Sequence, residues 1–147
     1  MMNTRLFMLV AALALGSTSA QAIEFRSVSE PAILYDTPSE QGRKMFIIAA
    51  GTPVEVVVVT DQWVKVRDPG GAITWIEERQ LSAQRTVMVT TDRATVRQRP
   101  EPDAPAVFET VRDAVLDLRG APVAGWVQVA HRDGNTGFIR VTDIWGL

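Results

Sequence analysis

The side chains that could carry out chemistry are few. The 147 residues include no cysteine and one histidine. The lack of cysteine excludes disulfides, thiolate zinc sites, iron–sulfur clusters and enzymes with a cysteine nucleophile. His131 precedes a turn sequence, Arg132-Asp133-Gly134, with no nucleophile or orienting partner for a general base. A single imidazole is also too few ligands for a zinc site. We therefore expect a non-enzymatic protein with no catalytic residue, no metal and no cofactor.

Two other patterns are weaker still as reactive sites. Glu77 and Glu78 are adjacent in the sequence, and neighbouring residues on a strand point to opposite faces, so these carboxylates do not converge. Gly70-Gly71 follows Asp68-Pro69 and indicates a turn rather than a phosphate-binding loop. Neither glycosidase nor phosphate chemistry is indicated.

Aromatic side chains provide the largest surfaces for binding. Trp75 and Phe138 are flanked by aliphatic residues, and we expect both in the core. Trp63 and Trp126 open their strands after a turn, and a core position and a ligand groove suit them equally well. Trp145 could close the end of the second half of the chain or face a partner.

Arginines are concentrated where the second half of the chain begins, at Arg93, Arg97 and Arg99. In a regular strand Arg97 and Arg99 share a face. The planar guanidinium group suits carboxylates, so this face is a candidate site for an acidic ligand. A solvated strand edge, paired with Glu101 or Asp103, is the alternative that we slightly favour.

The first 22 residues are typical of an export signal. Arg5 is followed by an uncharged apolar run, Leu6–Leu15, and then by Ala20-Gln21-Ala22, an A-x-A cleavage site. Ten apolar residues span ~15 Å as a helix, about half of a bilayer core. We predict cleavage after Ala22 and a periplasmic or secreted protein without a membrane span; an uncleaved anchor is the alternative. No cysteine follows the run, which excludes a lipoprotein anchor.

Composition narrows the choice of partner. The hydrophobic fraction of 46% is that of a globular protein, and the net charge of −2 argues against nucleic acid.

The rest of the chain is an internal repeat. Shifting the sequence by 62 or 63 residues superimposes identical residues, among them Ala32 on Ala94, Pro38 on Pro100, Phe46 on Phe108, Trp63 on Trp126 and Val66 on Val129. Both halves contain short β-branched runs bounded by turn signals, which predict strands. These strands are expected at 32–35, 54–59, 63–66 and 73–76, and again at 95–97, 115–118, 126–129 and 136–139.

One segment is ambiguous. Residues 106–119 place apolar side chains at helical spacing, but Leu116 and Leu118 also alternate with polar neighbours as in a strand. The corresponding segment, 45–57, contains Gly51 and Pro53, which disfavour a helix. We favour strand here and keep the amphipathic helix as the alternative.

About five short strands per ~60 residues predict an all-β fold of two tandem small barrels. The first comprises residues 23–84 and the second residues 85–147, with a break at Ser82-Ala83-Gln84-Arg85 that is short enough to fix the pair.

Several motifs in both halves resemble those of the bacterial SH3 (SH3b) family. Residues 94–100 (ATVRQRP) resemble its opening strand, and 51–56 (GTPVEV) its G-T-x-V-x-V strand. Residues 62–66 and 125–129 resemble G-W-x-x-V, and 71–76 and 134–139 resemble its returning hairpin. Tyr35 departs from the pattern by replacing an arginine, and Asp113, Gln62 and Thr74 by replacing glycines.

The resemblance implies an SH3-like barrel outside the cytoplasm that binds peptidoglycan or a peptide-like envelope ligand, with no catalytic domain. It also implies that the position of Trp63 and Trp126 borders the groove. The candidate ligand-binding residues are therefore Trp126, Arg97, Arg99, Trp63 and Tyr35. The alternative function is that of an adaptor between envelope proteins, without affinity for the wall. The sequence leaves open whether both halves bind, and in which oligomeric state.

Overall fold

The computed structural model describes residues 21–147, so residues 1–20 of the expected signal peptide lie outside the described part. The described chain is all-β and forms two sheets of seven strands each, which confirms the predicted fold class. The first sheet contains β1 (Glu24–Val28), β2 (Ala32–Tyr35), β3 (Lys44–Ile48), β4 (Pro53–Val59), β5 (Trp63–Arg67), β6 (Ile73–Glu77) and β7 (Leu81–Ser82), with a 3-10 turn, η1 (Glu78–Gln80).

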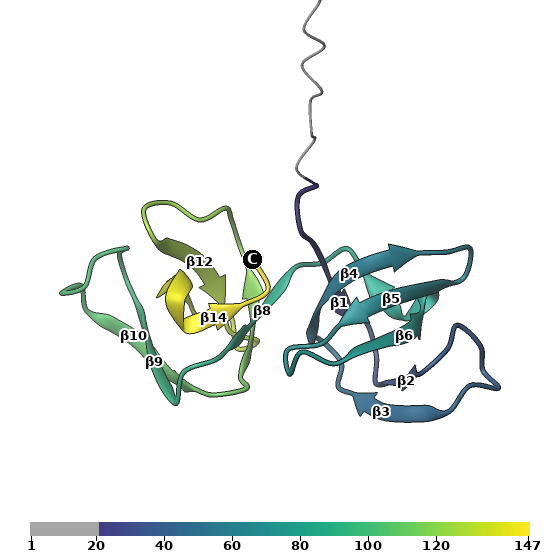
Figure 1. Ribbon diagram of the computed structural model, residues 1–147. Coiled ribbons are helices and arrows are strands. Elements are labelled where there is room, and N and C mark those ends of the chain that lie inside the picture. The colour runs from purple at the N-terminus through teal and green to yellow at the C-terminus, as the bar shows by residue number, and fades with distance from the viewer. Residues whose placement is uncertain (1–20) are drawn as a thin grey trace, which may run out of the picture.

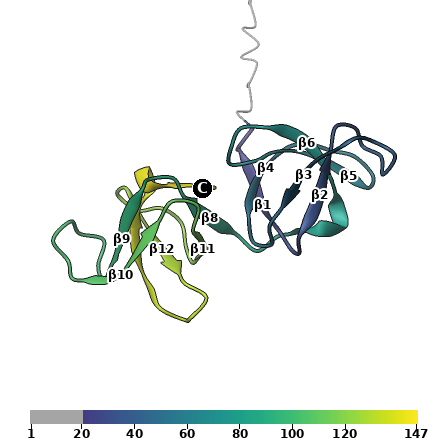
Figure 2. The same cartoon turned by 90° about the horizontal axis from the view of Figure 1, so that it is seen from below.

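The second sheet repeats the first. It contains β8 (Thr86–Val89), β9 (Arg93–Arg97), β10 (Ala106–Val111), β11 (Val115–Leu118), β12 (Trp126–Ala130), β13 (Thr136–Arg140) and β14 (Ile144–Trp145), with η2 at Val141–Asp143. The strand order is β3-β2-β6-β5-β4-β1-β7 in one sheet and β10-β9-β13-β12-β11-β8-β14 in the other, so each strand corresponds to the one seven places later. Figures 1 and 2 show the two sheets as separate lobes side by side.

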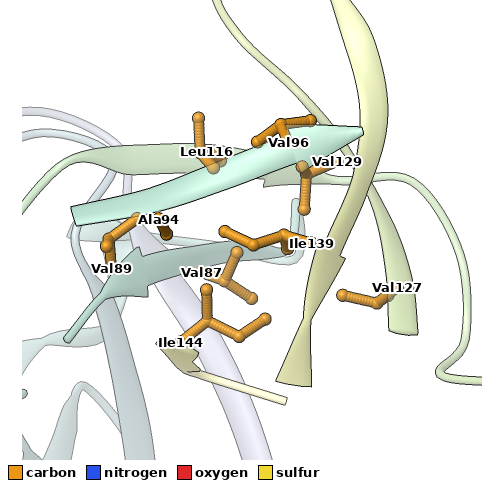
Figure 3. Close-up of a cluster of buried hydrophobic side chains, with 9 residues drawn as sticks. All are labelled: Val87, Val89, Ala94, Val96, Leu116, Val127, Val129, Ile139 and Ile144. Atoms are coloured by element: carbon orange, nitrogen blue, oxygen red, sulfur yellow. The ribbon is translucent and has the colours of Figure 1, made fainter. Parts of the chain in front are cut away.

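Each sheet curls around its own apolar core. The first core is built from Val28, Ala32, Leu34, Ile48, Val54, Val64, Val66 and Ile76. The second, shown in Figure 3, is built from Val87, Val89, Ala94, Val96, Leu116, Val127, Val129, Ile139 and Ile144. Because side chains alternate along a strand, one face of β5, β6, β12 and β13 supplies core residues. The side chains of the opposite face point away from the core, and this face is called the outer face below.

The hairpin turns lie where the sequence predicts them. In the first copy the Asp68 amide donates to the Ala72 carbonyl at 3.0 Å, and Gly71 has φ +90°. In the second copy the His131 amide donates to the Asn135 carbonyl at 2.8 Å, and Gly134 has φ +93°. Glycine adopts this left-handed backbone without the steric cost that other residues incur.

The ambiguous segment 106–119 forms strands, which confirms the interpretation that we favoured. It is divided between β10 and β11 by a turn in which Asp113 has φ +69°. Its counterpart Gly51 has φ +81°, so aspartate occupies a glycine-like position in the second copy. The estimate of five strands per copy was too low, because β1, β3 and β7 and their counterparts were not all recognised.

The two copies contact each other directly. The Phe25 and Trp145 rings meet edge to face with centroids 5.0 Å apart, and the Arg85 guanidinium lies 5.6 Å from the Phe25 centroid. The Thr86 hydroxyl donates to the Gly51 carbonyl at 2.6 Å across the same junction. Trp145, for which the sequence left two roles open, therefore packs against the first copy.

Within residues 21–147, no helix is both long and apolar enough to cross a membrane.

Candidate binding surface

Aromatic rings gather on the outer face of the first sheet. In the hairpin of β5 and β6, Trp63 pairs with Glu77 and Lys65 with Trp75, and β2 places Tyr35 opposite Trp75. The Tyr35 and Trp63 rings meet edge to face at 5.4 Å, and the Lys65 ammonium lies 5.6 Å from the Trp75 centroid. Strand pairing thus assembles one aromatic patch from three strands.

A small hollow, the first pocket, opens beside this patch. Its volume is about 260 Å³, and its lining residues are Pro38, Ser39, Glu40, Gln41, Gln62, Trp63 and Glu77. Its two ionisable side chains are carboxylates. Glu77 pairs with Arg79 outside the pocket, and this hydrogen bond, together with the charge of Glu77, raises the pKa of Arg79. The negative charge of Glu40 acts in the same direction.

The second sheet places different side chains at the same positions. Trp126 pairs with Arg140 across the hairpin, Gln128 pairs with Phe138, and β9 places Arg97 opposite Phe138. The Arg140 guanidinium carbon lies 5.0 Å from the centroid of the Trp126 ring, a distance typical of a cation–π contact. Trp126 is 8% exposed, yet it belongs to this outer face and not to the valine core.

The second pocket lies beside Trp126. It has a volume of about 180 Å³, and its lining residues are Arg93, Ala94, Thr95, Arg97, Trp126, Arg140 and Asp143. Arg97 is held in place because its Nη1 donates to the carbonyl of Ala104 at 2.8 Å. Arg93 forms a long ion pair of 3.5 Å with Glu109. Three guanidinium groups and one carboxylate therefore line this pocket, which is large enough for a single functional group of a ligand.

The structure groups four of the five candidate residues into two places. Tyr35 and Trp63 are in ring contact in the first copy, and Arg97 and Trp126 line the second pocket. Arg99 is separate: β9 ends at Arg97, and Arg99 pairs with Glu101 at 3.3 Å. The condition for a shared face, a regular strand through Arg99, is not met because the strand stops before Arg99, and the pairing with Glu101 confirms for Arg99 the alternative that we favoured.

Two further expectations also need correction. Trp75 and Phe138 are only half-buried and belong to neither core cluster. The core positions of β6 fall on Thr74 and Ile76, and those of β13 on Gly137 and Ile139, which turns the aromatic residue between them outward. Large side chains thus occupy the outer face.

Sequence reasoning missed Arg140. Its signal was present, because the repeat aligns Arg140 with Glu77, and the predicted hairpin places it opposite Trp126. Using that signal required the strand register as well as the strand positions.

The single histidine lies at another hollow. This hollow, of about 710 Å³, is lined by Ala49 and Ala50 of the first copy and by residues of the second that include Phe108, His131 and Asp133. His131 Nδ1 lies 3.1 Å from Asp133 Oδ1, and the Asn135 amide donates to the same oxygen at 2.9 Å. The hydrogen bond from the Asn135 amide is the main cause that lowers the pKa of Asp133, and His131 lowers this pKa further. These bonds order the hairpin turn.

A metal centre has no support in the described part of the chain. Residues 21–147 hold no group of three or more histidine and acidic side chains that could bind a metal ion. The adjacent Glu77 and Glu78 pair with different arginines, Arg79 and Arg26, as expected for carboxylates that do not converge.

Comparison with known families finds one match, repeated. The model of the bacterial SH3 domain matches residues 28–83 and again residues 90–146. No curated protein gives a significant match to the chain.

Similarity to solved structures is distant. NlpC2 from Trichomonas vaginalis is 14% identical with a TM-score of 0.40, over 88% of this chain and 50% of that one. An NlpC/P60 family protein from Bacillus cereus is 17% identical with a TM-score of 0.38, over 83% of this chain and 56% of that one. The chain spans about half the length of these proteins. Similarity at this level carries no argument about function.

Proposed function

Since the chain belongs to the bacterial SH3 domain family and contains two copies of the domain, we propose that it is an exported, non-enzymatic protein that binds peptidoglycan or a peptide-like part of the cell envelope. The apolar segment Leu6–Leu15 and the A-x-A sequence at 20–22 support export to the periplasm or beyond.

The observation that carries this proposal is a pocket beside the matching tryptophan on each outer face; the two linings share this tryptophan and the residue opposite it, and otherwise come from different parts of the repeat. Trp63 and Trp126 occupy matching register positions, opposite Glu77 and Arg140. Both pockets, of about 260 and 180 Å³, are smaller than the ~300–1,000 Å³ typical of pockets for whole small molecules. They suit single groups of an extended ligand that lies along the surface, as a peptide does. Trp63, which is partly exposed, supplies contact area beside the first pocket at low entropic cost, whereas the 8% exposed Trp126 contributes at the second pocket through its contact with Arg140.

Co-sedimentation with purified sacculi tests the proposal. The predicted mature chain, residues 23–147, is expected in the pellet at low and at physiological salt. The variant Trp63→Leu should be retained less, because it removes the ring beside the first pocket. The matched control Ile73→Ser changes an exposed side chain of the same sheet outside the pocket and should sediment like the wild type. Protein that stays in the supernatant at both salt concentrations would contradict wall binding.

A role as an adaptor between envelope proteins is the second candidate. It is favoured by edge strand β3, where Met45, Phe46 and Ile47 are 36, 51 and 81% exposed. Exposed apolar edge strands are sites where another chain can add a strand. Stoichiometric capture of one envelope protein that is lost in Ile47→Lys, together with no retention on sacculi, would favour the adaptor.

A further inference from the structure

The three arginines that line the second pocket have no basic counterpart in the first copy, and of these counterparts only Glu77 lines the first pocket. The strand register aligns Pro31 with Arg93, Tyr35 with Arg97, and Glu77 with Arg140. The second copy thus has three guanidinium groups where the first has a proline, a phenol and a carboxylate. The two pockets share only the tryptophan and the residue opposite it, so the first copy is a control for the fold and the tryptophan in the absence of the arginines.

Two of these guanidinium groups lack a carboxylate partner. Most arginines within residues 21–147 form ion pairs with N–O distances of 4.0 Å or less, and Arg97 and Arg140 are exceptions that line the same pocket. Asp143, the single carboxylate of the lining, is paired with neither. The third arginine, Arg93, is held only by its 3.5 Å pair with Glu109. The pocket therefore keeps an excess of positive charge.

Both unpaired groups are positioned before any ligand arrives. Contact with the Trp126 ring restricts Arg140, and the hydrogen bond to the Ala104 carbonyl restricts Arg97. Each guanidinium has five N–H donors, so these contacts leave donors free. A restrained guanidinium loses less conformational entropy on binding a carboxylate than a mobile lysine does.

We infer that the second pocket binds a carboxylate group of the ligand and that the first pocket does not. The inference rests on the proposed function for the kind of ligand, a peptide, since a peptide end or an acidic side chain supplies such a group. The small volume, about 180 Å³, favours this single group over a larger anion. The preference is a property of one copy, and duplication has produced two surfaces with different chemistry.

Titration of ¹⁵N-labelled protein with N-acetyl-dialanine tests the inference, with its C-terminal amide as the matched ligand. The free carboxylate should shift the Trp126 indole resonance and the amides of β12 and β13. The amide ligand should leave these resonances in place, and the Trp63 indole should respond to neither. Arg140→Gln should weaken binding about ten- to a hundredfold, as expected for loss of a hydrogen bond to a charged group. Arg99→Gln, which alters an exposed arginine outside the pocket, should bind like the wild type.

Several results would overturn the inference. These are equal binding of the acid and the amide, unchanged affinity in Arg140→Gln, a larger response at Trp63 than at Trp126, or tighter binding of inorganic phosphate than of the dipeptide. The amide spectrum of each variant shows whether it is folded. Arg97→Lys provides a second test, because it keeps the positive charge but removes the planar pair of N–H donors of the guanidinium group. Loss of the proposed function gives a different pattern, in which the protein binds the dipeptide but is not retained on sacculi.

Discussion

The contact between the copies predicts that they unfold as coupled units. Phe25 of β1 and Trp145 of β14 meet edge to face at 5.0 Å and 88°, although they belong to different sheets. We therefore expect the substitutions Phe25→Leu and Trp145→Leu to be non-additive. Leucine removes the ring from each position but keeps an apolar side chain, which limits the cavity that alanine would leave at the buried Phe25.

The size of the coupling follows from the geometry. An edge-to-face pair contributes ~0.5–1.5 kcal/mol beyond the burial of its surface. Arg85 lies over Phe25, but it is present in both backgrounds when only Trp145 changes, so it largely cancels from the cycle. The expected coupling free energy is therefore about 1 kcal/mol. A domain of ~60 residues has an unfolding free energy of ~3–9 kcal/mol, against which a change of this size is measurable.

Urea unfolding of the four proteins of the cycle, followed by circular dichroism, measures this coupling. The control cycle pairs Phe25→Leu with Phe138→Leu, since Phe138 lies on the outer face of the second sheet and forms no ring contact with Phe25. Its two substitutions should add to within ~0.3–0.5 kcal/mol. A coupling of Phe25 with Trp145 no larger than this control, or two transitions of which each responds only to its own substitution, would refute the reasoning.

Two substitutions and one pH titration test local packing and hydrogen bonding. Thr74→Val should leave the protein as stable or raise its unfolding free energy by up to ~1 kcal/mol, because the buried Thr74 hydroxyl has no hydrogen-bond partner; a clear loss in urea unfolding would contradict this. Gly137→Ala at the equivalent position should cost ~1–3 kcal/mol, since its Cβ would lie 2.7 Å from the Arg97 carbonyl oxygen; unchanged stability would show that the strands can separate. The pKa of Asp133 is lowered from 3.8, so its contribution to the hairpin turn is complete above 3.8 and is lost as the pH falls through the lower, folded value. The Asn135 amide resonance should therefore titrate with a midpoint below 3.8, and a midpoint at or above 3.8 would contradict the hydrogen bonding described.

Much of the fold was predictable because its strands are rich in β-branched residues and lie between turn sequences. The strand of Val54–Val59 and the hairpin after Trp63 are clear for that reason. Edge strand β3 was not recognised, because an edge strand with both faces near solvent has no alternation of apolar and polar residues: four of its five residues are exposed. Strands β7 and β14 have two residues each, too few to show any period.

The candidate site was predictable only in part. Tyr35 and Trp63 are close in space although β6 lies between their strands, and Arg97 and Trp126 line one pocket although β13 lies between theirs. Arg140 required knowledge of which residue lies opposite Trp126. The outward orientation of Trp75 and Phe138 contradicts the rule that large aromatic side chains fill the core, because in these strands smaller residues occupy the inward positions.

The central claim is that the outer faces beside Trp63 and Trp126 bind the envelope ligand. Amide and indole chemical-shift mapping of the mature chain with soluble peptidoglycan fragments tests it most directly. The account predicts shifts at the indole N–H of Trp63 or Trp126 and along the strands that carry them, β5 and β12. Shifts confined to the hollow at His131 and Phe108, or no shifts at fragment concentrations in the millimolar range, would contradict it.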